Sequence, residues 1–192
     1  MDGENVTEYT RKSIGEKVGI VQQRSVLFQG SIRDNLKWGD ENATDEDIWK
    51  AIEIAQAKEV VEGKPGKLDF QLEQNGRNLS GGQKQRLTIA RALVKKPEIL
   101  ILDDSASALD FATDAALRKS IRTMSNNPTV FIVSQRSASL MHADKIIVLD
   151  DGNVAGIGTH SELLANCEVY REIYNSQFKS AKGCLLYTSD AA

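Results

Sequence analysis

Apolar residues gather in three short and nearly continuous runs along this chain. The runs occupy residues 17–21, 99–102 and 130–133. Nearly continuous apolar runs of this length are typical of strands that are buried on both faces of a parallel sheet. Stretches with helical spacing separate the runs. The alternation predicts an α/β fold in which helices cover both faces of a mostly parallel sheet.

Two further apolar runs, at residues 146–149 and 154–157, predict a β-hairpin. Between them lies Asp151-Gly152, a dipeptide typical of tight hairpin turns. We expect this hairpin to form an antiparallel pair of strands at the edge of the sheet. A terminal helix is expected to begin at His160.

Helical spacing of apolar residues predicts the helices that connect these strands. They are expected at residues 31–38, 44–62, 80–94, 110–124 and 137–141. The second of them begins at Thr44, which with Asp47 has the spacing of a helix-start signal. Gly63 and Pro65 are expected to end it.

Composition narrows the class of protein only slightly. The chain has 192 residues, 41% hydrophobic and 27% charged, which is ordinary for one globular domain or slightly more. Its net charge of -3 gives no broad basic field, so nucleic acid is not an expected partner. No run approaches the ~20 apolar residues that span a bilayer, and the N-terminus has no signal peptide. Cys167 and Cys184 lack metal-ligand spacing, which fits a reduced cytosolic setting.

The run LSGGQ at residues 79–83 carries the most specific chemistry. Gly81 and Gly82 at a helix start let the backbone approach an anion, and the first N–H groups and the helix dipole favour negative charge there. Ser80 adds a hydroxyl donor for a phosphate. Ser80 and Gln83 also have the spacing of a capping box. A capping box does not require two glycines, each of which weakens a helix by about 1 kcal/mol. We therefore interpret the run as a phosphate-binding helix start.

A second signal is the pair of carboxylates at the end of the run at residues 99–102. Asp103 and Asp104 follow this apolar strand directly, where a nucleotide-bound Mg²⁺ needs an oxygen ligand. An aspartate that ends a buried strand can also cap the next helix. The neighbouring glycine motif favours the interpretation as a magnesium ligand.

Together, these motifs resemble the signature motif and the Walker B strand of an ABC-transporter ATPase domain. The resemblance covers residues 2–178 and implies a P-loop-NTPase-like α/β core with a mostly parallel sheet flanked by helices. It also implies a helical subdomain at about residues 31–95 that carries the signature motif. ATP and Mg²⁺ are the implied cofactors. The family's G-x-x-x-x-G-K-[ST] motif does not occur in the sequence, so residues 1–178 are expected to form an N-terminally truncated, partial ABC ATPase domain.

The resemblance assigns roles to further residues. Gln23 falls at the Q-loop position, where the family uses a glutamine to contact Mg²⁺ and the attacking water, and Asp103 matches the aspartate that holds Mg²⁺. Ser80, Gly81, Gly82 and Gln83 form the signature motif, which contacts a nucleotide on a facing ATPase subunit. Asp110 closes the D-loop, which crosses the interface between the two subunits.

The segment at residues 27–36 resembles the part of exporters where the ATPase contacts the membrane domain. It implies a membrane-spanning domain on the N-terminal side and a location on the cytoplasmic face of the cell membrane.

Two positions depart from the family pattern. Asp104 stands where the family usually has a glutamate that polarises the attacking water, and Gln135 stands where it usually has a histidine. Aspartate is one methylene shorter, so its oxygen would stop about 1 Å or more short of the required ~2.6–3.2 Å reach. Glutamine can donate a hydrogen bond to a γ-phosphate but cannot titrate near neutral pH as histidine does. Loss of a positioned general base typically removes about 10²–10⁴-fold in rate.

These departures predict a site that binds nucleotide but hydrolyses it slowly, in a chain whose signature motif is intact. Such a chain resembles the degenerate-site subunit of a heterodimeric multidrug- or lipid-type ABC exporter. Three alternatives remain open. They are a homodimer that tolerates Asp104 and Gln135, an ATP-clamping module with little hydrolysis of its own, and an ABC ATPase outside transport. The exporter-like segment argues against the last.

The C-terminal residues 179–192 are expected to lie outside the domain as a tail. Residues 184–192, CLLYTSDAA, do not continue the preceding pattern and look like a translated sequencing adapter. A short natural tail is the alternative interpretation. We exclude the segment from fold reasoning.

Overall fold

The computed structural model describes residues 3–105 and 107–185, with side chains as far as residue 178. The chain divides into two compact units, Met1–Val133 and Ser134–Ala192, and each is described by itself. The predicted tail carries no described side chains, and residues 186–192 of the suspected adapter segment lie outside the described residues. The domain boundaries proposed from the sequence stay a prediction.

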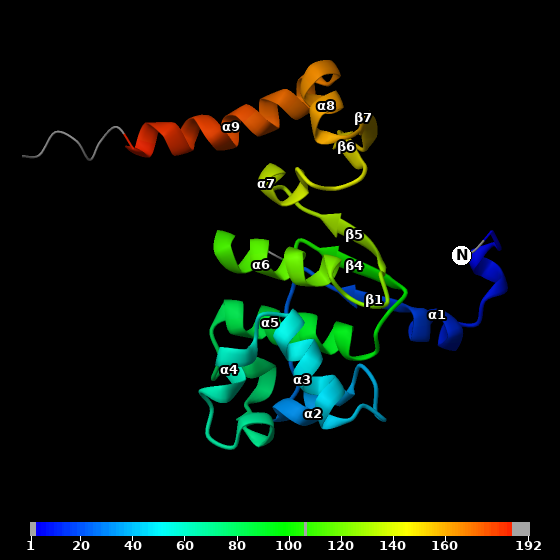
Figure 1. Ribbon diagram of the computed structural model, residues 1–192, viewed down its shortest axis with the longest axis vertical. Helices are drawn as coiled ribbons and strands as arrows, with labels where there is room; N and C mark the ends of the chain where they lie inside the picture. The colour runs from blue at the N-terminus through cyan, green and yellow to red at the C-terminus, as the bar shows by residue number, and fades with distance from the viewer. Residues whose placement is uncertain (1–2, 106, 186–192) are drawn as a thin grey trace, which may run out of the picture. The chain divides into compact units, whose positions relative to one another are not determined.

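The first unit contains the predicted parallel sheet (Figure 1). Strands β1 (Val18–Val21), β4 (Ile99–Asp103) and β5 (Thr129–Val133) lie in the order β1-β4-β5. Val21 pairs with Leu102, and Asp103 pairs with Val133, so the carboxyl ends of all three strands reach the same edge. Because residues at this edge come from distant parts of the sequence, the sheet is what brings the predicted site residues together.

Helices and short strands fill the rest of the first unit. The helices are η1 (Val6–Glu8), α1 (Arg11–Lys17), α2 (Ile32–Lys37), α3 (Asp45–Ile54), α4 (Lys58–Glu62), η2 (Lys67–Asp69), η3 (Gln74–Gly76), α5 (Gly81–Val94) and α6 (Phe111–Arg122). Strands β2 (Gly30–Ser31) and β3 (Gln71–Leu72) form a short antiparallel pair. Figure 1 shows α2, α3, α4 and α5 grouped on one side of the sheet.

Hydrogen-bonding side chains fix where several helices begin. In a capping box, the cap side chain accepts a hydrogen bond from the N–H of the third helical residue, and that residue's side chain accepts one from the N–H of the cap residue. In the described part of the chain, capping boxes begin four helices. The cap residues are Ser31, Thr44, Ser80 and Thr159. These side chains satisfy N–H groups that have no partner within their own helix. The sequence signal at Thr44 and Asp47 is therefore confirmed as a helix start.

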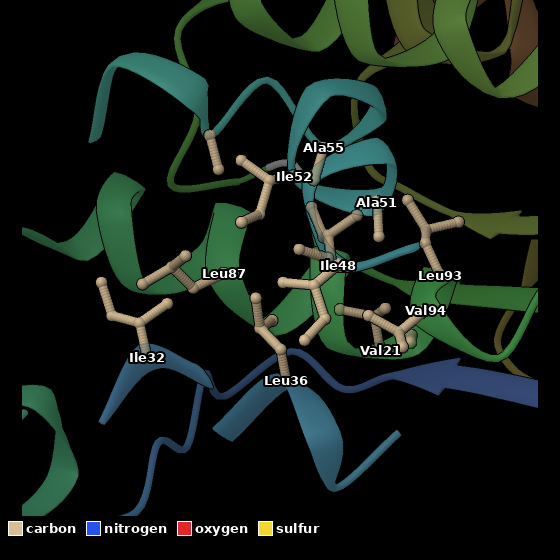
Figure 2. Close-up of a cluster of buried hydrophobic side chains, with 14 of the residues drawn as sticks. Val21, Ile32, Leu36, Ile48, Ala51, Ile52, Ala55, Leu87, Leu93 and Val94 are labelled. Carbon is tan, nitrogen blue, oxygen red and sulfur yellow. The ribbon is translucent and has the colours of Figure 1, made fainter. Parts of the chain in front are cut away.

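One hydrophobic core joins the sheet to the helices of the first unit. Leu100 and Leu102 of β4 point into it and are almost fully buried, together with residues of α5 and α6. Figure 2 shows how side chains from α2, α3 and α5 meet in this core, with Ile48 and Leu87 among them. Burial of side chains of this size typically contributes about 1.5–3 kcal/mol each. The core therefore fixes the position of α5, which begins with the signature glycines.

The opposite face of the parallel sheet is partly exposed, whereas the sequence predicted that it would be buried. Ile20, Ile101 and Phe131 form a row across β1, β4 and β5 by their pairing register. Ile20 and Phe131 are 56% and 55% exposed. The apolar runs predicted burial on both faces, but α5 and α6 both contribute to the core on the Leu100 face.

The helix expected at residues 44–62 is broken. It forms as α3 and α4, with Gln56 between them at a φ of 57°. The Gln56 Nε2 atom donates to the carbonyl oxygens of Glu53 and Ile54 and to Ser120 Oγ of α6, at 3.2, 3.3 and 2.9 Å. The two local bonds and the tertiary bond to Ser120 stabilise a break that the local sequence, rich in helix-forming residues, does not signal.

The second unit contains α7 (Ser137–Leu140), β6 (Ile146–Asp150), β7 (Asn153–Gly158), α8 (His160–Asn166) and α9 (Glu168–Leu185). Strands β6 and β7 form the predicted antiparallel hairpin, but they pair as a two-stranded sheet of their own and not, as predicted, at the edge of the parallel sheet. Its core consists of Ile146, Val148, Leu163, Cys167 and Tyr170. The expected terminal helix is divided because Cys167 has an extended backbone between α8 and α9.

Within the described part of the chain, no helix combines the length and the apolar content that crossing a bilayer requires.

Candidate functional site

The carboxyl edge of the parallel sheet brings three of the predicted site residues together. Gln23 follows β1 by two residues, Asp103 ends β4, and Asp104 comes next. Gln23 Nε2 donates a hydrogen bond to Asp104 Oδ2 at 3.3 Å. Gln23 and Asp103 are exposed, and Asp104 is partly buried. The pair of carboxylates and the glutamine therefore face a surface that a ligand can reach.

Asp104 has an unusual backbone conformation. Its φ of 43° lies in the left-handed region, which most residues with a side chain avoid and which aspartate tolerates better than most. Its N–H donates to the Val133 carbonyl oxygen at 2.9 Å, and its own carbonyl accepts from Ser107 N–H and Oγ at 3.2 and 2.9 Å. These bonds hold the strained turn, and with it the direction of the Asp104 carboxylate.

The donor set at this edge suits a magnesium ion. Among the described residues, no group of three or more histidine, cysteine, aspartate or glutamate side chains forms a metal cage. Mg²⁺ in nucleotide sites usually takes one or two protein oxygens and completes its shell with phosphates and water. Asp103 and the side-chain oxygen of Gln23 supply ligands of that kind. The residues present therefore fit a nucleotide-bound Mg²⁺ better than a site built from protein ligands alone.

The signature motif lies at the exposed start of α5. Ser80 Oγ accepts from Gln83 N–H at 3.3 Å, and Ser80 N–H donates to Gln83 Oε1 at 3.1 Å, so the capping box exists. Among the described residues, no backbone acceptor lies within hydrogen-bond reach of the Gly81 and Gly82 N–H groups. The capping box and the phosphate-binding interpretation are thus compatible, because the cap uses a different N–H from the two glycines.

The two glycines have different surroundings. A Cβ atom built on Gly81 would meet nothing within 4 Å, whereas one built on Gly82 would lie 3.1 Å from the carbonyl oxygen of Ala108. Gly82 therefore lets α5 pack closely against the backbone at Ala108. Packing within the chain does not explain Gly81, whose open surroundings leave room for an anion or another subunit.

Asp110 is the N-cap of α6. Its Oδ1 accepts from Thr113 N–H at 2.9 Å and its Oδ2 accepts from Thr113 Oγ1 at 2.7 Å. The bond from the Thr113 backbone lowers the pKa of the Asp110 carboxyl. Asp110 thus has a structural role in this chain, and its predicted contact with a facing nucleotide stays a prediction.

Gln135 belongs to the second unit, whereas the other predicted site residues belong to the first. Its carbonyl oxygen accepts from Gln177 Nε2 of α9 at 2.6 Å, and Gln177 Oε1 accepts from Ser137 N–H and Oγ at 2.9 and 2.8 Å. Gln177 therefore fixes the backbone of the segment that carries Gln135. Sequence reasoning missed Gln177, because one glutamine on a polar helix face gives no signal.

An aromatic surface lies partly in the segment at residues 27–36 that resembles an exporter contact and partly just after it. Phe28 and Trp38 are stacked with ring centroids 4.3 Å apart and are 41% and 68% exposed. The Arg91 guanidinium lies 5.7 Å from the Phe28 ring centroid. Asn35 is buried and holds the Phe28 backbone, accepting from its N–H at 2.8 Å and donating to its carbonyl at 2.9 Å. Exposed aromatic side chains held in this way are typical of protein interfaces.

Fold and site together define an α/β nucleotide-binding domain. A family model described as "ABC transporter" matches residues 1–107. The chain therefore belongs to the ABC transporter family, as an ATP-binding domain with exporter-like relatives.

Known relatives agree with this assignment. The chain is 44% identical over 178 residues to the uncharacterized ABC transporter ATP-binding protein YfiB of Bacillus subtilis, covering 93% of the chain and 31% of the relative. It is 37% identical over 177 residues to a Staphylococcus aureus protein that is named a "putative multidrug export ATP-binding/permease protein". The match covers 92% of this chain and 31% of that relative.

A solved structure also has the same fold. It is titled "Structure of a bacterial Atm1-family ABC exporter with ATP bound" and superposes with a TM-score of 0.86 at 34% identity, covering 92% of this chain and 31% of that chain. The chain thus spans about a third of the length of the proteins that it matches.

Proposed function

We propose that this chain is the ATP-binding part of an ABC exporter and that its signature motif completes an ATP site on a second ABC ATPase subunit. The observation that carries the proposal is the exposed start of α5, where the Gly81 and Gly82 N–H groups have no backbone acceptor among the described residues. Amide groups at a helix start bind phosphate through hydrogen bonds and the helix dipole. The open space around Gly81 leaves room for the phosphates of a nucleotide seated on the facing subunit.

The chain's own site lies at the carboxyl edge of the sheet. Asp103 and Gln23 would hold Mg²⁺, which when bound neutralises charge on the β- and γ-phosphates. Asp104 would face the attacking water but is one methylene shorter than a glutamate, and its Oδ2 already accepts from Gln23. Gln135 would donate a hydrogen bond to the γ-phosphate. Because none of these groups is a well-placed general base, we propose slow hydrolysis at this site.

These assignments favour a heterodimer, in which the partner subunit supplies the faster ATP site. We also propose, from its exporter relatives, that the domain lies on the cytoplasmic face of a membrane and is joined to a membrane-spanning domain. The aromatic surface of Phe28 and Trp38 supports that contact, since Phe28 lies in the exporter-like segment, Trp38 stacks on it from two residues beyond the segment's end, and both are exposed. A homodimer is the alternative, and it requires hydrolysis that depends on Asp104.

ATPase rates of the transporter that carries this chain test the proposal. Gly81→Ala should lower hydrolysis at least about tenfold, because its methyl group displaces the phosphate that the amides bind at the facing site. Asp104→Asn should change the rate less than about twofold, because this carboxylate contributes little. Abolished hydrolysis in Asp104→Asn, or robust hydrolysis by this subunit without a partner, would contradict the degenerate-site proposal.

The 192-residue chain alone should bind ATP weakly and hydrolyse none. Its sequence contains no G-x-x-x-x-G-K-[ST] motif, and that loop supplies most of the phosphate contacts in nucleotide sites of this type. Titration with a fluorescent ATP analogue measures the affinity. A micromolar dissociation constant would show that the remaining residues bind nucleotide without that loop.

A further inference from the structure

The C-terminal helix α9 binds the segment that carries Gln135 through the side chain of Gln177. Gln177 Nε2 donates to the Gln135 carbonyl oxygen at 2.6 Å, and Gln177 Oε1 accepts from the Ser137 N–H at 2.9 Å. The same Oε1 accepts from Ser137 Oγ at 2.8 Å. One amide group therefore bonds to the backbone on both sides of Arg136, and a shift of this segment would break hydrogen bonds at both positions.

The segment depends on this contact because α7, which follows it, is too short to hold itself in place. α7 has four residues, and its N-cap, Arg136, makes no side-chain cap hydrogen bond. A helix of this length is not stable on its own. The Ser137 N–H is one of the groups at the start of α7 that lack a partner within the helix, and Gln177 satisfies it from a distant part of the chain. Because Ser137 is also buried, water does not readily replace Gln177 there.

Tyr170 fixes the position of α9 in the second unit. It is 3% exposed in the core of that unit, and its hydroxyl oxygen lies 2.8 Å from His160 Nδ1. Gln177 follows Tyr170 by seven residues on α9, which places both side chains on one face of the helix, about 10 Å apart along its axis. The helix therefore connects the core of the second unit to the backbone of Gln135.

We propose that Gln177 is a positioning residue that holds Gln135 for its contact with the γ-phosphate, so that α9 sets how well this subunit distinguishes ATP from ADP. The inference rests on the proposed function, in which the Gln135 side chain donates a hydrogen bond to the γ-phosphate. A glutamine side chain has several rotatable bonds, so it reaches an acceptor efficiently only from a fixed backbone. ADP has no γ-phosphate, so its binding does not depend on Gln135.

Two substitutions of Gln177 separate its hydrogen bonds in the ligand-free 192-residue chain. Gln177→Ala loses all of them, whereas Gln177→Glu keeps an acceptor for Ser137 and loses the donor to the Gln135 carbonyl. In NMR relaxation measurements, the Gln135 N–H should have an order parameter of about 0.85 in the unmodified chain and below about 0.6 in both variants. The Ser137 N–H should exchange at least about fivefold faster in Gln177→Ala only. An unchanged order parameter of Gln135 in both variants would overturn the inference.

Competition of ATP and ADP against a photoreactive ATP analogue, measured on this subunit of the whole transporter, tests the discrimination between the nucleotides. Gln177→Ala should weaken competition by ATP about fivefold and leave competition by ADP unchanged. In a Gln135→Ala background, Gln177→Ala should have no further effect, because the group that it positions is gone. Asn175→Ala, a substitution of an exposed polar residue on the same helix, is the matched control and should affect neither nucleotide.

Equal weakening of ATP and ADP by Gln177→Ala would overturn the inference, as would unchanged ATP competition in a transporter where Gln135→Ala weakens it. If Gln135→Ala itself leaves ATP competition unchanged, the γ-phosphate contact of the proposed function is wrong, and the discrimination attributed to α9 is wrong with it. The NMR measurement on the ligand-free chain still decides whether Gln177 positions Gln135, so the two failures are distinguishable.

Discussion

Two adjacent glycines at the start of α5 illustrate how one residue type serves two purposes. The neighbours of Gly82 lie within its own chain, since Ala108 O would sit 3.1 Å from an added Cβ. Gly81 has open space instead. The motif therefore combines a packing glycine with one that is free to contact another molecule.

Alanine at each position should separate these purposes in a stability measurement. Gly81→Ala should leave the free energy of unfolding unchanged or raise it by up to about 1 kcal/mol, because alanine restricts the unfolded chain. Gly82→Ala should lower it by about 1 kcal/mol or more, because the methyl group crowds the Ala108 carbonyl. Urea unfolding followed by circular dichroism measures both. Equal destabilisation by the two variants would show that Gly81 also has a packing role.

The sequence predicted which residues cap a helix or end a strand more reliably than it predicted their backbone conformations. The pairing of Ser80 with Gln83, and the position of Asp103 at a strand end, follow from spacing and strand pattern. The left-handed backbone of Asp104 does not, because it depends on the Val133 carbonyl and on Ser107, both of which tertiary structure supplies.

At the scale of single elements, Gln56 shows how a tertiary contact ends a helix. Its backbone carbonyl accepts from Arg86 of α5 at 2.8 Å, and its side chain reaches Ser120 of α6. The break between α3 and α4 therefore contacts two neighbouring helices. Apolar spacing predicts the helical face correctly but contains no information about these long-range bonds.

Two substitutions of Gln56 test this account. Gln56→Gly keeps the left-handed backbone and loses the side-chain bonds, whereas Gln56→Ala loses the bonds and strains the backbone. We expect Gln56→Ala to lower the free energy of unfolding by about 1 kcal/mol more than Gln56→Gly. Chemical denaturation measures the difference. If alanine is tolerated as well as glycine, the break does not depend on the backbone conformation of this residue.

The start of α3 makes stability depend on acidic pH. Lys96 donates to Asp47, and with the cap bonds of Thr44 this lowers the pKa of the Asp47 carboxyl from 3.8 to about 2. A carboxyl with a lowered pKa in the folded state stabilises the fold above its unfolded pKa and loses that effect as pH falls. The contribution should therefore be complete above about pH 4 and should disappear towards pH 2.

Unfolding curves of the unmodified chain and of Asp47→Asn, compared at pH 6 and at decreasing pH, measure this contribution. The stability difference between the two proteins should shrink as the pH falls. Asp40→Asn serves as a control for general charge effects, since Asp40 carries a similar charge and lies near the same helix. A difference that stays constant down to pH 2 would show that the negative charge of Asp47 does not contribute to stability.

At the scale of the whole molecule, the sequence predicts the fold class better than it predicts which surfaces of the sheet are exposed. Alternating apolar runs and helices predict the parallel sheet, and Asp151-Gly152 predicts the hairpin, because both signals are local. The exposure of one sheet face depends instead on where α5 and α6 pack. Hydrophobicity alone does not distinguish a covered face from an open one.

The exposed apolar row should make the 192-residue chain prone to self-association. Phe131→Ser removes the largest apolar side chain of the row, so we expect it to slow aggregation several-fold at 37 °C. Light scattering of equal protein concentrations measures the rate. Thr129→Ser, an exposed substitution on the same strand, should leave the rate unchanged. If Phe131→Ser aggregates as fast as the unmodified chain, association occurs through other surfaces, such as the apolar side of the hairpin.

The two hydrogen bonds between the Asn35 side chain and the Phe28 backbone affect the free energy with which a membrane domain would bind here. A flexible loop must give up conformational entropy before it can dock, and that loss subtracts from the binding free energy. Here the loop backbone is already fixed within its own domain, by bonds at 2.8 and 2.9 Å. A membrane domain that docks on the stacked rings would contact a backbone that is already ordered. Little of the contact energy would then be lost to ordering, and a displacement of one domain would be transmitted directly to the other.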